Sequence, residues 1–121
     1  MAQIKRVEDV HDLVDEFYKR VREHRELAPI FNEKIGQLWF LHIDTLTRFW
    51  QTLLLEDRTY YGSPFPKHLE LPIKDKHFEL WLELFTETVD DLFEGEKAEE
   101  AKHRASQLAK SFRSKMKREI A

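Results

Sequence analysis

One imidazole, that of His68, lies in the part of the sequence that is richest in proline. Four residues that disfavour a helix surround it: Gly62, Pro64, Pro66 and Pro72. Proline fixes φ and has no N–H to donate, so residues 60–81 do not form one long helix. A simple turn between two helices needs far fewer residues than this segment provides. We therefore expect the segment to hold His68 in a fixed pose, facing an apolar slot between helices.

Three more side chains with hydrogen-bonding groups lie on predicted helices: Tyr18, His42 and Trp81. At ~100° per residue, His42 falls near the middle of the apolar face of its helix. A buried imidazole without a partner costs on the order of 1–3 kcal/mol, so we expect His42 to have one. All three could instead be core residues, with His42 bonded to a backbone carbonyl or a tyrosine hydroxyl.

Taken together, these four side chains favour a binding site. One fixed imidazole on a connection and three hydrogen-bonding groups on different helices, around an apolar slot, are typical of a pocket for haem and a small ligand. Haem iron takes one axial histidine, and a diatomic ligand bound opposite it becomes polarised and is stabilised by buried donors. The alternative is that His68 is a loop residue without a function and that Lys67 beside it is merely solvated.

The sequence also contains the Glu-x-x-His spacing of di-iron bundles twice. Glu8 and His11 form one pair, and Glu100 and His103 form the other. The apolar stripes of the two helices place Glu8, Glu100 and His103 away from the core, whereas the ligands of an internal di-metal site must point inward. No His-Glu-x-x-His motif occurs. We therefore expect no di-metal site, and we expect His11, His24 and His103 at the surface.

Composition narrows the class of protein. With 121 residues, the chain is expected to form one domain over residues 1–121 with a single core. The net charge is −3 and Lys and Arg are spread out, so we expect no nucleic-acid partner. The absence of cysteine excludes thiolate metal sites and covalent haem attachment, so N or O ligands would hold any cofactor. Without a signal peptide, lipidation motif or long apolar run, the expectation is a soluble cytoplasmic protein with no membrane partner.

Apolar periodicity predicts an all-α protein with four main helices, which must position these side chains. The first helix has a stripe at spacings of three and four: Val7, Val10, Leu13, Val14, Phe17, Tyr18 and Val21. Residues 28–32, around Pro29, are predicted to form a short turn or a single helical turn. The second helix runs from about residue 37 to residue 55 and has a broad apolar face: Leu38, Trp39, Leu41, Leu46, Phe49, Trp50 and Leu53.

The third and fourth helices follow the proline-rich connection. Asp75 is the predicted N-cap of the third helix and Gly95 its C-cap. Its predicted inward residues are Phe78, Trp81, Leu82, Phe85, Val89 and Leu92. His77 fits either a helix start or a pocket wall. The fourth helix has a stripe of mainly small residues that permits close helix approach: Ala98, Ala101, Ala105, Leu108, Ala109, Phe112 and Met116.

Five segments of the chain resemble the third group of bacterial truncated haemoglobins. They are Leu-Ala-Pro-Ile-Phe-Asn (27–32), Arg-Phe-Trp (48–50), Tyr-Gly-Ser-Pro (61–64), Lys-His-Leu (67–69) and His-Phe-Glu-Leu-Trp-Leu-Glu-Leu-Phe (77–85). Single pieces such as Phe-Trp are weak, but the whole series is specific. It covers nearly the whole chain, from Val7 to about Phe112, in the right order and at the right spacing.

The resemblance implies a truncated globin fold, a two-over-two helical sandwich around a b-type haem (haem b). It places the proximal iron ligand at His68 and the distal positions at Tyr18, His42 and Trp81. The haem-packing phenylalanine of the family falls on Phe31. The residues expected to wall the pocket are Leu46, Phe49, Phe78 and Leu82. Lys67 is the implied partner of a haem propionate. Which of Tyr60 and Tyr61 faces the haem stays open, as does whether His42 binds the iron or acts as a gate.

The leading hypothesis is a haem protein that binds O₂ or another small diatomic ligand at the iron and retains it tightly. Tyr18 and Trp81 are donors, so they should slow ligand release, which argues against bulk oxygen delivery. A second hypothesis is a haem enzyme with peroxidase-like or nitric-oxide-consuming activity; without a reductase domain of its own, it would need an external reductase. A third is a helical interaction module without a cofactor.

Overall fold

The computed structural model describes residues 2–35, 38–55 and 74–120, without the side chains of residues 33–35 and 115–120. These residues form five helices: α1 (Val7–Glu23), α2 (Ala28–Ile35), α3 (Trp39–Leu55), α5 (Asp75–Leu92) and α6 (Glu96–Ile120). Within the described ranges the only β-type pairing is a bridge between Ala2 and Phe93. The all-α prediction is confirmed.

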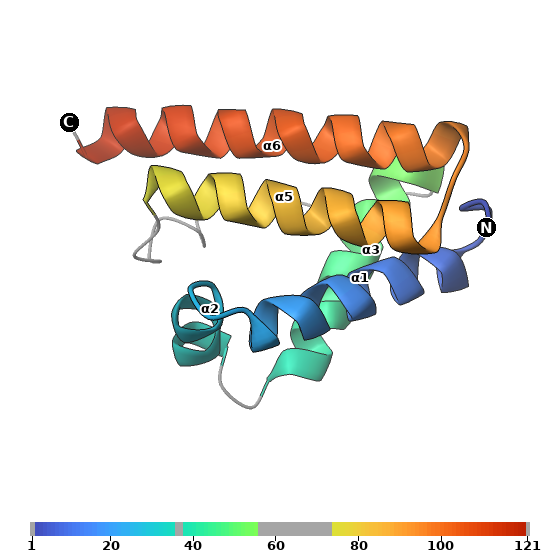
Figure 1. The fold of residues 1–121 in the computed structure, drawn as a ribbon, viewed down its shortest axis with the longest axis horizontal. Helices are drawn as coiled ribbons and strands as arrows, with labels where there is room; N and C mark the ends of the chain where they lie inside the picture. The colour runs from blue at the N-terminus through green and yellow to red at the C-terminus, as the bar shows by residue number, and fades with distance from the viewer. Residues whose placement is uncertain (1, 36–37, 56–73, 121) are drawn as a thin grey trace.

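Two pairs of helices make up the bundle (Figure 1). The contacts between elements are most extensive for α1 with α3 and for α5 with α6, and α1 also packs along α5. In Figure 1, α5 and α6 run side by side, α1 lies along α5, and α3 passes behind α1. The short α2 follows α1 and packs against it. This arrangement is the predicted sandwich of two helices over two.

The stripe on α1 forms the centre of the core. Its buried residues are Val10, Leu13, Val14, Phe17, Tyr18 and Val21, whereas Val7, which was predicted in the same stripe, is 37% exposed. The first turn is acidic and the last turn is basic, which suits the helix dipole. The Asp9 carboxylate accepts the backbone N–H groups of Lys5 and Arg6 at 2.9 Å each, and these bonds lower the pKa of Asp9. Sequence periodicity and local hydrogen bonds therefore agree on this helix.

Small residues allow α6 to approach the rest of the bundle closely. Four alanines of its stripe are buried: Ala98, Ala101, Ala105 and Ala109. On α5, Phe85 and Val89 are fully buried, and Thr88 is buried with its hydroxyl donating to the carbonyl of Leu84 at 2.7 Å. These buried side chains are thus apolar or, at Thr88, have the polar group satisfied.

The core-facing side of α3 differs from the predicted one. Leu38 and Leu41 are 57% and 50% exposed, so their assignment to the buried face was wrong. Trp39 and Trp50 are buried as predicted, and Thr47 and Leu54, which were not predicted on this face, are buried with them. Leu46, Phe49 and Leu53, which were predicted on the same face, are only half-buried. A broad apolar stripe on α3 serves two purposes: one edge enters the core, and the neighbouring edge faces a pocket.

Helix ends also differ from the predictions. Lys74, not Asp75, is the N-cap of α5, and its backbone N–H donates to Nδ1 of His77 at 2.9 Å. The C-cap of α5 is Phe93, not Gly95. Residues 28–32 belong to α2, which is eight residues long.

The α1–α2 corner gives a histidine an unexpected position. His24, predicted at the surface, is half-buried, and its Nδ1 accepts the backbone N–H groups of Glu26 and Leu27 at 3.1 and 3.3 Å. Histidine thus accepts backbone N–H groups at two helix ends: His24 in the turn between α1 and α2, and His77 at the third position of α5, where glutamate or glutamine is the usual acceptor.

Gly95 joins α5 to α6 with φ +96°, in the left-handed region that favours glycine. A Cβ added there would lie 3.3 Å from Cγ of Gln3. We expect Gly95→Ala to lower the free energy of unfolding by about 1–2 kcal/mol, measured by urea denaturation. The control is Glu87→Ala, an exposed change in the middle of α5, which should stay within about 0.5 kcal/mol. Equal effects of the two changes would contradict this account of the α5–α6 turn.

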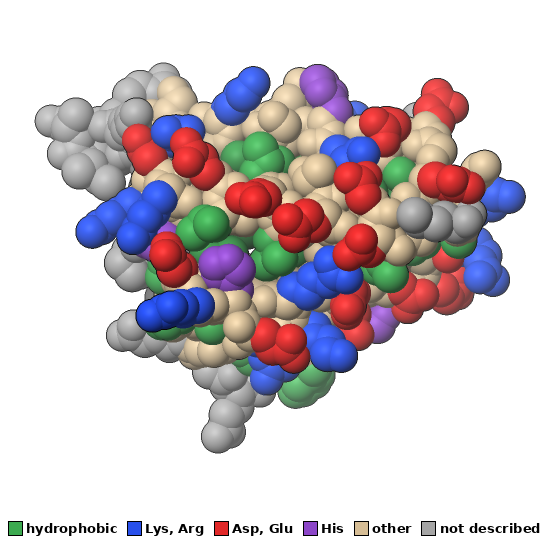
Figure 2. Space-filling view, in the orientation of Figure 1, with side chains coloured by type: hydrophobic (Ala, Val, Ile, Leu, Met, Phe, Trp, Pro, Cys, Tyr) green, Lys and Arg blue, Asp and Glu red, His purple; other side chains and the backbone are tan. Residues whose placement is uncertain are grey.

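Acidic and basic side chains are interspersed over the face of the molecule shown in Figure 2. Several of them join helices through ion pairs. Arg20 on α1 bonds to Asp91 on α5 at 2.8 Å, and Lys102 on α6 bonds to Asp90 on α5 at 2.7 Å. Such exposed pairs contribute little each, so the apolar core provides most of the stability. None of the helices in the described ranges has the length and apolarity needed to cross a membrane.

Candidate functional site

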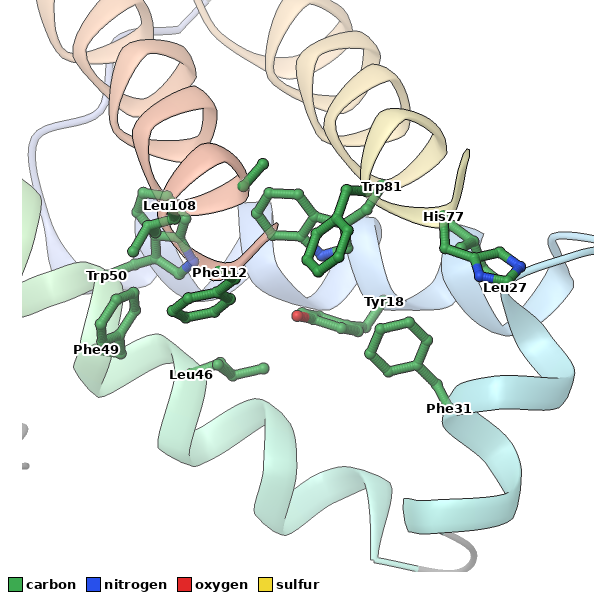
Figure 3. A pocket seen from close by; sticks show the side chains of 12 residues that line it. Tyr18, Leu27, Phe31, Leu46, Phe49, Trp50, His77, Trp81, Leu108 and Phe112 are labelled. Carbon is green, nitrogen blue, oxygen red and sulfur yellow. The ribbon is translucent and has the colours of Figure 1, made fainter. Parts of the chain in front are cut away.

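An apolar pocket opens between the two helix pairs (Figure 3). Its lining combines residues of α3, α5 and α6 with residues from α1, α2 and the corner between them: Tyr18, Leu27, Phe31, Leu46, Phe49, Trp50, His77, Phe78, Trp81, Leu108, Ala109 and Phe112. The space between these side chains is about 630 Å³, including the part open to solvent. Pockets for cofactors and small ligands are typically lined in this way, by apolar and aromatic side chains with a few polar groups.

Tyr18 brings a polar group into this apolar space. Its side chain comes from the inner face of α1 and is only 5% exposed. The ring packs edge-on against Phe17 and Phe31, with centroids 4.7 and 6.3 Å apart. Figure 3 shows its hydroxyl oxygen pointing into the pocket. Burial raises the pKa of Tyr18, so the hydroxyl stays neutral and keeps its proton.

Trp81 is the hydrogen-bond partner of Tyr18. An indole can only donate, so its N–H is the donor and the Tyr18 oxygen is the acceptor, a contact that partly offsets the rise in the pKa of Tyr18. The indole ring stacks on Phe85 with centroids 5.6 Å apart and planes 12° apart, and it meets Phe17 edge-on at 5.6 Å. Trp81 is thereby held in one orientation, with its N–H directed at Tyr18.

His42 lies beside this pair and is not among the residues lining the pocket. Its ring is perpendicular to that of Tyr18, with centroids 5.2 Å apart and planes at 85°. It is also perpendicular to the ring of Trp39, at 5.7 Å and 84°. The side chain is half-buried, and its Nε2 is shielded from solvent. The structure thus brings Tyr18, His42 and Trp81 together, with two of the three in the pocket wall.

The positions predicted to pack on a cofactor divide in the structure. Phe31, Leu46, Phe49 and Phe78 line the pocket. Leu82 does not; it is half-buried and packs against the core. Lys67 and His68, like Tyr60 and Tyr61, lie outside the described residues. The predicted axial ligand and the predicted propionate partner therefore stay predictions.

Six lining residues were not predicted as site residues: Leu27, Trp50, His77, Leu108, Ala109 and Phe112. Five of them are apolar or aromatic residues, and nothing in their spacing separates a pocket wall from a core. His77 was left open between a helix start and a pocket wall, and it serves as both. Burial lowers the pKa of His77 first and nearby Lys76 lowers it further, so its imidazole is mainly neutral near pH 7.

The Glu-x-x-His pairs do not converge on a metal site in the part of the chain that is described. Glu8, His11 and His103 are exposed. Glu100 pairs with Lys97 at 3.3 Å. The described side chains contain no group of three or more His, Cys, Asp or Glu residues that could hold a metal ion.

The described residues fit a haem. A pocket with aromatic and aliphatic walls suits an apolar macrocycle, and the Tyr18 hydroxyl and the Trp81 indole add hydrogen-bonding groups to those walls. An all-helical two-over-two bundle with this pocket defines a protein of the truncated globin class.

Comparison with known proteins identifies the family. The family model of bacterial-like globins matches residues 3–117. A group 3 truncated haemoglobin from Campylobacter jejuni is 36% identical over 109 residues, which cover 87% of this chain and 86% of the relative. The crystal structure of a group III truncated haemoglobin from Campylobacter jejuni superimposes with a TM-score of 0.88 at 33% identity, covering 96% of this chain and 95% of that one.

The chain belongs to the bacterial-like globin family, and the resemblance to third-group truncated haemoglobins is confirmed. Membership of a globin family implies that the chain binds haem.

Proposed function

We propose that this chain is a b-type haem protein that binds O₂ or another small diatomic ligand at the iron, with a polar distal side that retains the ligand. The observation that carries the proposal is the buried Tyr18 hydroxyl, which points into a largely apolar pocket and accepts a hydrogen bond from Trp81. Haem supplies, when bound, an iron centre with an axial position for a diatomic ligand.

We assign the proximal and packing roles as follows. His68 would provide the nitrogen that holds the iron, and Lys67 would pair with a propionate. Four residues that line the pocket in the structure would pack against the macrocycle: Phe31, Leu46, Phe49 and Phe78. Leu82 supports this wall from the core side rather than lining it.

The Tyr18 hydroxyl is the group that would donate a hydrogen bond to a bound ligand, and the Trp81 N–H acts on the ligand through it. Because its oxygen accepts from Trp81, its own proton can be directed to a ligand inside the pocket. A hydrogen bond to a polarised ligand is stronger in this water-poor environment than at the surface. Trp81 fixes the direction of that proton. Slow release of O₂ follows from this arrangement, and slow release suits retention rather than bulk delivery.

The proposal predicts that the purified chain takes up haem one to one and then binds CO and O₂ reversibly. Apolar walls and neutral donors favour both steps. The measurement is a haem titration followed by visible spectra of the ferric, ferrous and carbonyl-bound protein.

Two other experimental results would each favour a different function for this chain. A protein that folds fully, stays colourless and ignores added haem would favour a helical interaction module. Sustained consumption of peroxide or nitric oxide with an external reductant, beyond one equivalent per haem, would favour an enzyme.

A further inference from the structure

We propose that Trp39 is a positioning residue that holds His42 beside Tyr18 and away from the iron of a bound haem. The inference rests on the proposed haem function, which it deepens by assigning a residue that controls the distal histidine. None of the contacts of Trp39 was evident from the sequence.

Trp39 is held by side chains from two other helices. It is the first residue of α3 and is 5% exposed. Its indole N–H donates to Oδ1 of Asn32, on α2, at 3.1 Å. The guanidinium carbon of Arg22, on α1, lies 4.9 Å from the centroid of its ring, a cation–π contact. We call Arg22, Asn32 and Trp39 the Trp39 clamp, because together they join three helices at one corner.

The clamp contacts the distal residues directly. The Trp39 ring lies 5.9 Å from the ring of Tyr18 and 5.7 Å from that of His42. His42 is thus perpendicular to two rings that are themselves fixed, that of Tyr18 by the core and that of Trp39 by the clamp. Edge-to-face contacts of this kind are favourable beyond the area they bury, and each corresponds to roughly a two- to tenfold bias in population.

The position of His42 gives the clamp a functional consequence. His42 lies next to Tyr18 but outside the pocket lining, so its imidazole must move before it can enter the pocket. Such a move breaks its contacts with both rings. Trp39 therefore favours a state in which the distal axial position is free for a gas, and it sets how often His42 competes for that position.

Trp39→Leu tests this inference, because it removes the ring while leaving an apolar side chain that favours helix. We expect the ratio of low-spin, six-coordinate to five-coordinate haem to rise roughly two- to tenfold. The measurement is the visible spectrum of the ferrous, ligand-free holoprotein.

The deciding comparison is the same substitution in a His42→Leu background, where the spectrum should no longer respond to residue 39. A double-mutant cycle of this kind isolates the coupling between the two residues. No spectral change in the single variant, or a change that persists without His42, would overturn the inference. A purely structural defect would produce the second pattern.

A milder pair of variants tests the clamp if Trp39→Leu does not fold. Asn32→Ala removes the acceptor of the Trp39 N–H, and Arg22→Met removes the cation above its ring. Each should shift the ¹³C-labelled imidazole resonances of His42 in the carbonyl-bound protein, because the Trp39 ring moves relative to them. The matched control is Arg20→Met, which removes a cation from the same helix that pairs instead with Glu16 and Asp91. Unchanged His42 resonances in both clamp variants would contradict the proposal.

The outcomes for the two levels of proposal are distinct. Wild-type protein that takes up no haem contradicts the proposed function. If the wild-type protein binds haem and gas but the clamp variants leave the His42 resonances and the haem spectrum unchanged, only the assignment of Trp39 is contradicted.

Discussion

Replacing His68 with glycine is expected to strip the protein of haem, and free imidazole in the buffer is expected to restore it. The substitution removes the proposed axial nitrogen and leaves a space that imidazole fills. Outer-shell partners of a metal already account for roughly 10–100-fold in affinity, so loss of the ligand itself should cost at least that much. Haem affinity is measured from the Soret absorbance during titration, with and without imidazole.

His103→Ala is the control for this experiment, because it removes an exposed imidazole from α6. It should leave haem affinity unchanged. If the His68→Gly protein keeps its full colour and its usual spectrum without imidazole, another residue holds the iron, and the proposed assignment of the proximal side is wrong.

The second large effect is expected at Tyr18. Tyr18→Phe keeps the ring and its contacts with Phe17 and Phe31 but removes the hydroxyl. We expect O₂ to dissociate on the order of ten- to a hundredfold faster, the range for a lost hydrogen bond to a charged or polarised partner. The measurement is stopped-flow displacement of O₂ by CO.

Trp81→Phe shows whether the indole acts through Tyr18. Alone, it should accelerate O₂ dissociation by a smaller factor, since the hydroxyl remains but loses the donor that orients it. In the Tyr18→Phe background it should add little, because the two residues act as a unit. Titration of Tyr18 should not change the wild-type dissociation rate up to about pH 9, since burial raises the pKa of Tyr18 above its ordinary value of about 10. No change in either variant would defeat the distal-donor mechanism.

The fold could be predicted where the apolar stripe of a helix faces only the core. On α1 the regular spacing from Val10 to Val21 can only face the core, and the structure agrees. On α3 the apolar residues are too numerous for one face, and periodicity cannot tell a core edge from a pocket edge. Leu38 and Leu41 were misplaced for this reason. The N-cap of α5 was wrongly assigned to Asp75 because capping rules favour short polar residues. In the structure Lys74 is the N-cap, and its backbone N–H donates to His77.

The site was predictable to the extent that polar groups stood out against apolar faces. Tyr18 and Trp81 carried that signal, and the structure places them in contact. Leu108 and Phe112 carried none, since a pocket wall and a core look alike in a helical stripe. Trp39 was recognised only as an apolar residue, because its partners Arg22 and Asn32 are brought to it by the packing of three helices.

The placement of the three tryptophans gives the molecule an optical property of its own. Trp50 and Trp81 line the pocket, and Trp39 is separated from it by a single tyrosine ring. The sequence contains no other indole. All three tryptophans therefore lie within energy-transfer range of a porphyrin in the pocket. Bound haem should quench their fluorescence, so the fluorescence intensity reports the fraction of the protein that carries haem.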